Sequence, residues 1–301
     1  MIDTPQIVRQ NSMLAAMPII FVFLWSTGFI GAKLGLPYIE PMTFLGVRFA
    51  ICALIFLPVV FLTSTRWPDR WQDWFHIGFS GLLMHGGYLG FVFWAISLGV
   101  PAGTSALIAG IQPLIVAALA GFLLKETVSF RQWSGLLAGL CGVFLVVADK
   151  LSLGEGSVFG IFLSFLALFS IAFGTLYQKK YCSGMSLKSG NFIQFLVATL
   201  YFAVLAFLME ERTIVWSGEL IFALGWLVLV LSLGAVSLLY LLLRRGAAAT
   251  VSSLFFLVPP CTAVVAYILF DEKLSGYSFA GMAIVVLGVA LVNMKSGKPV
   301  K

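Results

Sequence analysis

The sequence predicts an all-α integral membrane protein in which ten transmembrane helices form two inverted five-helix repeats. Three observations carry this prediction. The chain is strongly apolar, and its apolar residues fall into ten runs long enough to cross a bilayer. In addition, the second half of the chain repeats a pattern of the first half, with the opposite orientation in the membrane.

The composition excludes a water-soluble globule. Of the 301 residues, 61% are hydrophobic and 10% are charged, whereas soluble domains carry about 25% charged residues. A helix of about 20 apolar residues spans a hydrocarbon core of about 30 Å, and in lipid it must satisfy its own backbone hydrogen bonds. The net charge of +6 lies almost entirely in the breaks between runs, so it indicates membrane topology rather than a nucleic-acid partner.

Hydropathy runs and the breaks between them place the helices. The breaks contain the prolines, glycines and charged residues that end helices, and none is long enough to form a separate domain. The expected spans are 14–35, 42–63, 74–97, 101–123, 130–148, 157–178, 190–209, 219–243, 247–270 and 276–294.

A pattern at 102–147 recurs without a gap at 248–293, with an offset of 146 positions. Each copy is an apolar segment with a central proline, an acidic break and a second apolar segment rich in glycine. The matched pairs are Thr104/Thr250, Pro113/Pro259, Ala117/Ala263, Ala120/Ala266, Leu123/Leu269, Glu126/Glu272, Ser129/Ser275, Gly135/Gly281, Gly142/Gly288, Leu145/Leu291 and Val146/Val292. The chain therefore divides into two five-helix units, 1–150 and 151–301.

Charge counting orients these units. Cytoplasmic loops collect Lys and Arg, and with the N-terminus inside, 13 of the 17 cations in loops or at helix ends lie inside. Only Lys33, Lys150, Arg212 and Lys273 lie outside. Both termini are therefore predicted to be cytoplasmic. Because each unit has an odd number of crossings, the second is inverted relative to the first, an arrangement typical of transporters with a substrate site near the midplane.

The chain also resembles a known family over essentially its whole length. The resemblance lies in the LWSTGFIGAKLGLP segment (24–37), in Pro41 followed by Arg48, and in the central proline and terminal glutamate of the spans 101–123 and 247–270. These features are similar to the drug/metabolite transporter superfamily, in its EamA-type ten-helix branch. The resemblance implies an inner-membrane carrier with a central cavity, often an exporter of amino acids or other small metabolites. It does not specify the substrate.

Pro113 and Pro259 are expected to kink their helices, because proline removes a backbone hydrogen bond and clashes with the preceding turn. Their equivalent positions in inverted halves favour a role at a cavity or hinge. The alternative is a static kink, which membrane helices tolerate. Gln112 and the doubled Pro259–Pro260 break the symmetry between the two copies.

Arg48 is the one formal charge placed well inside an expected span. A guanidinium in the membrane costs several kcal/mol unless it is paired or hydrated, and its planar fork suits a carboxylate or phosphate. A substrate contact is one interpretation. The other is a structural arginine that binds backbone carbonyls or extends to the interface.

His85 lies near the centre of the span 74–97, with Tyr88 one turn away on the same face. Because histidine titrates near neutral pH, His85 could couple transport to protons. The alternative is a neutral histidine held by hydrogen bonds within the bundle.

No carboxylate lies deep inside an expected span, which disfavours an organic cation as cargo and favours a neutral, zwitterionic or anionic metabolite. Aromatic and hydroxyl side chains are candidates for the wall of its binding site, although aromatic residues in membrane helices often only pack or anchor at the interface. The candidates are Trp25, Ser26, Thr27, Tyr88, Trp94, Gln112, Tyr177 and Tyr240, in addition to Arg48 and His85.

Pairs of glycines four residues apart, such as Gly135/Gly139, allow close approach of helices. In the spans 130–148 and 276–294 this surface could also hold a second copy, so a monomer and a homodimer both remain open. The four cysteines are scattered and indicate neither a disulfide framework nor a metal site.

These features together predict a secondary active transporter working by alternating access, with a small metabolite and the lipid bilayer as its partners. No cofactor, metal or nucleic acid is expected, and there is no phosphate-binding glycine loop for ATP. A passive channel is one alternative. A membrane-embedded lipid-modifying enzyme is another, but it would require convergent catalytic groups that the sequence does not offer.

Overall fold

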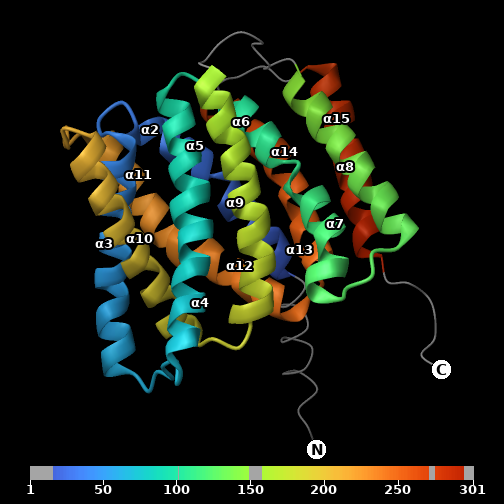
Figure 1. Ribbon diagram of the computed structural model, residues 1–301. Coiled ribbons are helices and arrows are strands. Elements are labelled where there is room, and N and C mark those ends of the chain that lie inside the picture. Colours follow the sequence, from blue (N-terminus) through green and yellow to red (C-terminus); the bar gives the residue numbers. More distant parts are fainter. Residues whose placement is uncertain (1–15, 101, 149–157, 271–274, 295–301) are drawn as a thin grey trace, which may run out of the picture.

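The computed structural model of the protein describes residues 16–100, 102–148, 158–270 and 275–294. Regular structure in these ranges is helical, apart from an isolated antiparallel bridge between Ile39 and Ile214. Ten helical segments lie side by side and form one bundle (Figure 1). The fold class predicted from the sequence is confirmed.

The ten segments follow the predicted order. Nine of those described are long and apolar enough to cross a bilayer, and the apolar part of α8 is somewhat shorter (Phe130–Val146). In chain order they are Ala16–Gly35, which contains α2 (Gly28–Gly35); α3 (Pro41–Leu62); α4, η1 and α5 (Trp71–Gly81, Leu82–Gly87, Tyr88–Ser97); α6 and α7 (Ala102–Ala109, Gln112–Leu124); α8 (Phe130–Ala148); α9 (Val158–Cys182); α10 (Leu187–Met209); α11, η2 and α12 (Gly218–Trp226, Leu227–Ala235, Val236–Arg245); α13, η3 and α14 (Ala248–Ser253, Leu254–Leu257, Val258–Phe270); and α15 (Gly276–Asn293).

The ends of the segments differ from expectation by a few residues. The largest difference is at α9, which continues to Cys182 instead of ending near 178. Cys182 was expected in a loop, but it is the last residue of this helix and is buried against Ile77 and Ile193. The apolar contacts of this last turn extend the helix beyond the point at which its lysines suggest an end.

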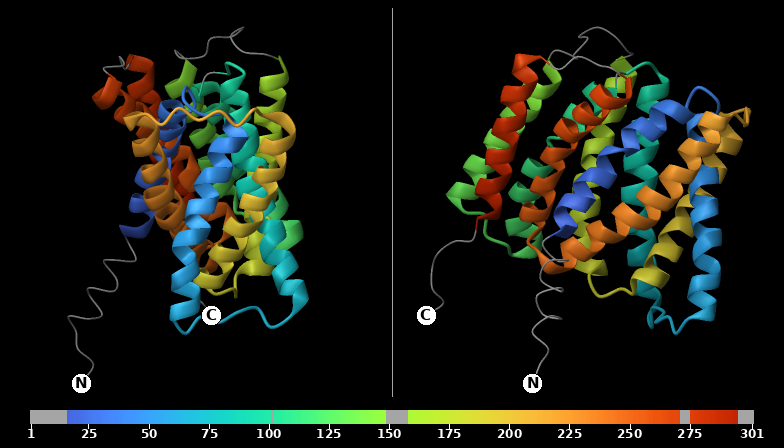
Figure 2. Two further views of the ribbon diagram at one scale, coloured as in Figure 1. Left: turned by 90° about the vertical axis from the view of Figure 1, so that its left-hand side faces the viewer. Right: turned by 180° about the vertical axis from the view of Figure 1, so that it is seen from behind.

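Equivalent helices of the two repeats pack against each other at opposite sides of the bundle. The fifth and tenth segments, α8 and α15, form the most extensive helix pair, and the second and seventh, α3 and α10, form the next (Figure 2). The first, third, fourth, sixth, eighth and ninth segments fill the space between these pairs. This pairing across the repeats places the centre of the bundle where the two halves meet.

Glycine makes the α8–α15 contact close. A Cβ atom added to Gly135 would lie 2.6 Å from the carbonyl oxygen of Gly288, and one added to Gly142 would lie 2.7 Å from that of Gly281. A side chain at either position would collide with backbone, which cannot move aside. The glycine surface that suggested a contact with a second copy is therefore used within the chain.

The charged residues gather at the two ends of the bundle. The basic end carries Arg66, Arg70, Lys125, Arg131, Lys179, Lys180, Lys188, Arg244 and Arg245, and the acidic end carries Glu40, Glu210, Glu211 and Glu219. The basic end is at the bottom in Figure 1. Two carboxylates, Glu210 and Glu126, cap helices of the other repeat.

At the acidic end, the carboxylate of Glu210 accepts hydrogen bonds from the backbone N–H groups of Met42 and Thr43, both at 2.7 Å. At the basic end, Glu126 accepts one from the N–H of Ala248 at 2.8 Å and pairs with Lys179 at 2.8 Å. A carboxylate suits the start of a helix because it satisfies free N–H groups and opposes the helix dipole. Glu126 thus lies at a helix end, as expected for the terminal glutamate of the span 101–123, whereas Glu272 lies outside the described residues.

The fourth and ninth segments are interrupted at equivalent places. Gly110 and Ile111 form a turn between α6 and α7, and the 3₁₀ turn η3 lies between α13 and α14. Pro113 and Pro259 are each the second residue of the helix that follows. Proline is favourable there because the first N–H groups of a helix have no partner within it. The expected kinks are thus breaks between two helices, and their hinge role stays a prediction.

The third and eighth segments contain π-helical stretches, η1 and η2, at places that the repeat makes equivalent. No pattern in the sequence predicts them. A π-helical turn widens the helix and is found frequently at functional sites. Both stretches face the centre of the bundle.

Candidate functional site

A pocket lies in the centre of the bundle, and both π-helical stretches line it. It encloses about 560 Å³ of empty space, counting the space at its open side. Its walls come from the first segment, α3, η1, α5, η2 and α12. The lining residues are Trp25, Gly28, Phe29, Ala32, Arg48, Met84, His85, Tyr88, Leu89, Val92, Phe93, Leu231 and Val236.

Arg48 supplies the positive charge of this pocket. It is the eighth residue of α3, and only 1% of it is exposed. Its Nε donates a hydrogen bond to the Ser232 hydroxyl of η2 at 3.0 Å, and its guanidinium carbon lies 5.3 Å from the centre of the Phe49 ring. Among the described residues that line the pocket, none is acidic. Arg48 is thus held by the second repeat without a carboxylate in the pocket wall.

His85 begins a chain of buried hydrogen bonds that leads away from the pocket. Its Nε2 lies 3.4 Å from the hydroxyl of Tyr240, which donates to Oε1 of Gln194 at 2.6 Å. Nε2 of Gln194 donates to Oε1 of Gln178 at 3.0 Å, and Ser80 donates to the same oxygen at 2.6 Å. The chain links α4, η1, α9, α10 and α12, so it holds helices of both repeats together beside the pocket.

Aromatic rings form the other wall. Trp25 and Tyr88 stack with their ring centres 6.5 Å apart, and Phe255 of η3 meets Trp25 edge-on at 5.2 Å. Stacked and edge-on pairs are the favourable arrangements of aromatic rings. The pocket therefore combines an apolar aromatic wall with one buried cation, as ligand sites with a few placed polar groups do.

The structure brings four of the ten sequence-predicted site residues to the pocket: Trp25, Arg48, His85 and Tyr88. Tyr240 contacts it through His85. The candidates in the first segment have other contacts. The hydroxyl of Ser26 lies 2.6 Å from the carbonyl oxygen of Val22 in the same segment and 3.3 Å from that of Val258 in α14. Thr27 accepts a hydrogen bond from the Trp226 indole at 2.8 Å. These two residues join the first segment to its neighbours.

Three further candidates lie away from the pocket. Trp94 is partly exposed and meets Phe159 edge-on. The hydroxyl of Tyr177 lies 2.6 Å from Nδ1 of His76, near the basic end. Gln112 is buried, and its amide donates to Thr175 and Ser252 at 3.3 and 3.4 Å.

Comparison with known proteins agrees with this architecture. The EamA-like transporter family matches residues 12–148 and again 158–294, which is most of the chain. The chain belongs to the EamA-like transporter family. Each of the two family matches covers five of the ten helical segments.

Several curated EamA-type relatives are similar over almost their full length. A protein named a probable amino-acid metabolite efflux pump, from Escherichia coli K12, is 27% identical over 93% of this chain and 94% of its own. A protein of the same name from Salmonella typhimurium is 26% identical with the same coverage. One solved crystal structure shares the fold, with a TM-score of 0.77 at 20% identity over 94% of this chain and 96% of its own.

Three polar residues that were not candidates from the sequence support the pocket from behind its wall, and two apolar ones line it. Ser232, Gln194 and Gln178 are polar residues inside apolar spans, and each is buried and hydrogen-bonded near the centre. Their polarity at such depth is a signal that the sequence does contain. Phe29 and Leu231 carry no such signal, because they are apolar residues in apolar spans.

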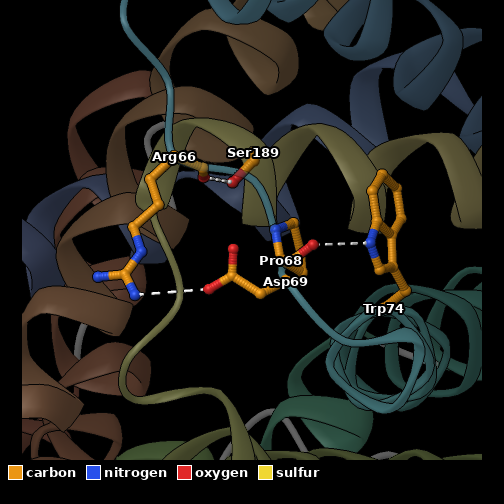
Figure 3. A network of polar contacts seen from close by, with 5 residues as sticks. All are labelled: Arg66, Pro68, Asp69, Trp74 and Ser189. Carbon is orange, nitrogen blue, oxygen red and sulfur yellow. Dashed lines mark hydrogen bonds and ion pairs between the residues drawn. The ribbon is translucent and has the colours of Figure 1, made fainter.

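A separate, polar pocket lies at the surface of the basic end, between the loop before α4 and the start of α10. Figure 3 shows its contacts: the Ser189 hydroxyl donates to the carbonyl of Arg66 at 2.7 Å, and the Trp74 indole donates to that of Pro68 at 3.2 Å. Arg66 and Asp69 form an ion pair at 3.7 Å with both side chains largely exposed. Such a surface pair contributes little to stability, so these contacts position a loop and are not a site at membrane depth.

Proposed function

We propose that the chain is a secondary active transporter that exports a small neutral, zwitterionic or anionic metabolite by alternating access. The observation that carries this proposal is the central pocket, in which Ser232 of the second repeat holds Arg48 of the first. A site between two inverted halves faces one side and then the other as the halves rock about it. The efflux-pump names of the relatives support an amino acid or a similar metabolite as the cargo.

The electrostatics of the pocket support a cargo with an anionic group. A buried guanidinium is costly without a partner, and a carboxylate or phosphate of the cargo would provide one through charge-assisted hydrogen bonds. The described carboxylates all lie at the ends of the bundle: Glu40, Asp69, Asp73, Glu126, Glu210, Glu211 and Glu219. An organic cation would meet Arg48 with no compensating charge in the wall.

We place the basic end in the cytoplasm of a cell whose inner (plasma) membrane holds the protein, with both termini on that side. The concentration of Lys and Arg at this end supports the assignment. In a variant without native cysteines, a membrane-impermeant thiol reagent should label Glu211→Cys in intact cells but not Arg245→Cys. The reverse pattern would invert the topology.

We propose transport without catalysis. Among the described residues there is no group of three or more His, Cys, Asp and Glu side chains that could hold a metal ion. His85 is the candidate for proton coupling because it lies in the pocket wall and adjoins a buried hydrogen-bond chain. His85→Gln should then flatten the pH dependence of flux, and an unchanged profile would leave it a structural residue.

Reconstitution tests the proposal directly. Purified protein in liposomes should give saturable counterflow of at least one member of a panel of amino acids and related metabolites. Arg48→Ala should reduce that flux more than it reduces the amount of folded protein, whereas Arg245→Ala, a matched change at the exposed basic end, should not. Absence of saturable flux across the panel would reject the transporter, and ion currents that do not saturate would indicate a channel instead.

A further inference from the structure

A second pocket adjoins the first and shares part of its wall. It contains about 260 Å³ of empty space, counting the space at its open side. Trp25, Phe29 and Tyr88 line both pockets. Its remaining walls come from the interruptions of the fourth and ninth segments: Ala106, Ala109 and Gly110 on one side, and Phe255, Val258 and Pro259 on the other.

The two pockets differ in chemistry. The first contains Arg48 and His85, whereas the second has no charged lining residue among those described. Small residues create the space in the second pocket: Ala106, Ala109 and Gly110 follow one another along one side of the fourth segment where α6 ends. Any larger side chain at 106 or 109 would occupy that space.

The shared aromatic residues lie between a charged pocket and an apolar one. The stacked rings of Trp25 and Tyr88 form this partition, with Phe255 behind Trp25. Flat aromatic faces are suited to an apolar chain passing along them. The arrangement matches a ligand that has an anionic head and an apolar tail.

We propose that the two pockets are the head and tail sites of one substrate, an amphipathic organic monoacid whose carboxylate binds Arg48 and whose apolar chain extends past Trp25 and Tyr88 to Ala106 and Ala109. This inference rests on the proposed transport function and narrows its cargo from an amino acid or similar metabolite to an organic acid without an ammonium group. Ala106 and Ala109 set the longest chain that fits. Because no acidic side chain among the described residues lines either pocket, an ammonium group on the substrate would be buried without a counter-ion.

Binding to the purified protein tests the chain-length rule. The probes are butanoate, hexanoate and octanoate, with norleucine and hexylamine as the zwitterion and cation that match hexanoate in length, and the method is isothermal titration calorimetry. Because burial of a methylene is favourable by about 0.8 kcal/mol, affinity should rise at least tenfold from butanoate to octanoate. Hexanoate should bind more tightly than norleucine, and hexylamine should not bind.

Substitutions then separate the two sites. Ala106→Leu should weaken octanoate binding about tenfold and change butanoate binding less than twofold, whereas Arg48→Met should weaken all three acids alike. Ala118→Leu, the same change at an exposed position of the same segment, should alter nothing. If Ala106→Leu does not elute as a folded monodisperse protein, Ala109→Leu provides the same test.

The inference is overturned if affinity does not depend on chain length, if norleucine binds more tightly than hexanoate, or if Ala106→Leu weakens butanoate and octanoate equally. Counterflow in liposomes distinguishes the two-part site from the transport function. The probes are alkanesulfonates, because they stay ionised and do not leak through the bilayer as neutral acids. Binding without counterflow rejects the transporter but not the two-part site. Counterflow of other cargo without chain-length selection rejects only the two-part site.

Discussion

The third and eighth segments occupy equivalent places in the two repeats, and they share a backbone distortion but not a chemistry. Both are π-helical where they meet the central pocket, at η1 and η2. At an offset of 146 positions, His85 corresponds to Leu231, and both line the pocket. Trp94 corresponds to Tyr240, yet Trp94 is partly exposed while Tyr240 is 1% exposed. The duplication has kept the widened helix and changed the side chains on it.

The difference shows how an inverted repeat makes an asymmetric site. Arg48 corresponds to Gln194 at the same offset. Arg48 lines the pocket, and Gln194 instead lies in the hydrogen-bond chain that begins at His85. A symmetric pocket would hold two like charges near each other, which repel. Divergence of the halves leaves one cation for one cargo group.

The largest expected effect is on transport, and it follows from replacing Arg48 with glutamine, the residue at the equivalent position in the second repeat. Arg48→Gln removes the charge and keeps a polar side chain of moderate length. A charge-assisted hydrogen bond contributes about 1.5–3 kcal/mol, so kcat/KM for an anionic cargo should fall by roughly 10- to 100-fold in liposomes. Arg245→Gln is the matched control at the basic end. Equal transport by both variants would show that the asymmetry of charge has no functional role.

The next effect is on stability, and it is expected to differ between a glycine that precedes η1 and a glycine within η2. A Cβ on Gly81, which precedes η1, would lie 3.0 Å from the Cα atom of Gln194, whereas one on Gly234 in η2 would lie 3.4 Å from a Leu24 methyl group. Gly81→Ala should therefore destabilise the protein by about 2 kcal/mol through overpacking. Gly234→Ala should be neutral or stabilising, because alanine favours helix. Denaturant unfolding in detergent measures both, and equal losses would contradict the comparison.

A smaller loss of stability is expected at Tyr240 than at Gly81, and it should exceed the loss at Trp94, the equivalent position in the first repeat. Tyr240→Phe removes the hydroxyl that donates to Gln194 and leaves a buried acceptor unpaired, which costs about 1–3 kcal/mol. Trp94→Phe, at the equivalent but partly exposed position, should change stability by less than about 1 kcal/mol. A thermal unfolding series on the two variants provides the measurement. If both changes cost the same, the hydrogen-bond chain does not stabilise the fold.

The smallest effect concerns the residue before each proline. Gln112 corresponds to Val258, and its Oε1 is buried with no hydrogen-bond partner among the described residues. Gln112→Val should leave the free energy of unfolding within about 1 kcal/mol of the wild type, because the unpaired oxygen offsets the two long hydrogen bonds that are lost. A loss above 2 kcal/mol in denaturant unfolding would show that Gln112 holds the break between α6 and α7 together.

Much of the fold was predictable because lipid imposes a strong constraint on sequence. Apolar runs identified the segments, and the repeat of Pro113 at Pro259 located both interruptions. The site was less predictable. Arg48 and His85 stood out by their charge and depth, but Phe29 and Leu231 look like any lipid-facing residue until the neighbouring helices are in place. The division of the chain at residue 150 stays a prediction.

The sequence by itself determined the number of spans, their inverted duplication and the sparse set of polar residues in the membrane, since each of these depends on local hydropathy and on charge at the breaks. Only the tertiary structure decided which helix faces meet. It directed Trp25 and Tyr88 to the pocket, paired Arg48 with Ser232, and left Trp94 and Tyr177 outside. The physical reason is that a helix that is apolar on all sides has no hydrophobic stripe to indicate which face points inward. Packing against the neighbouring helices therefore selects the buried face.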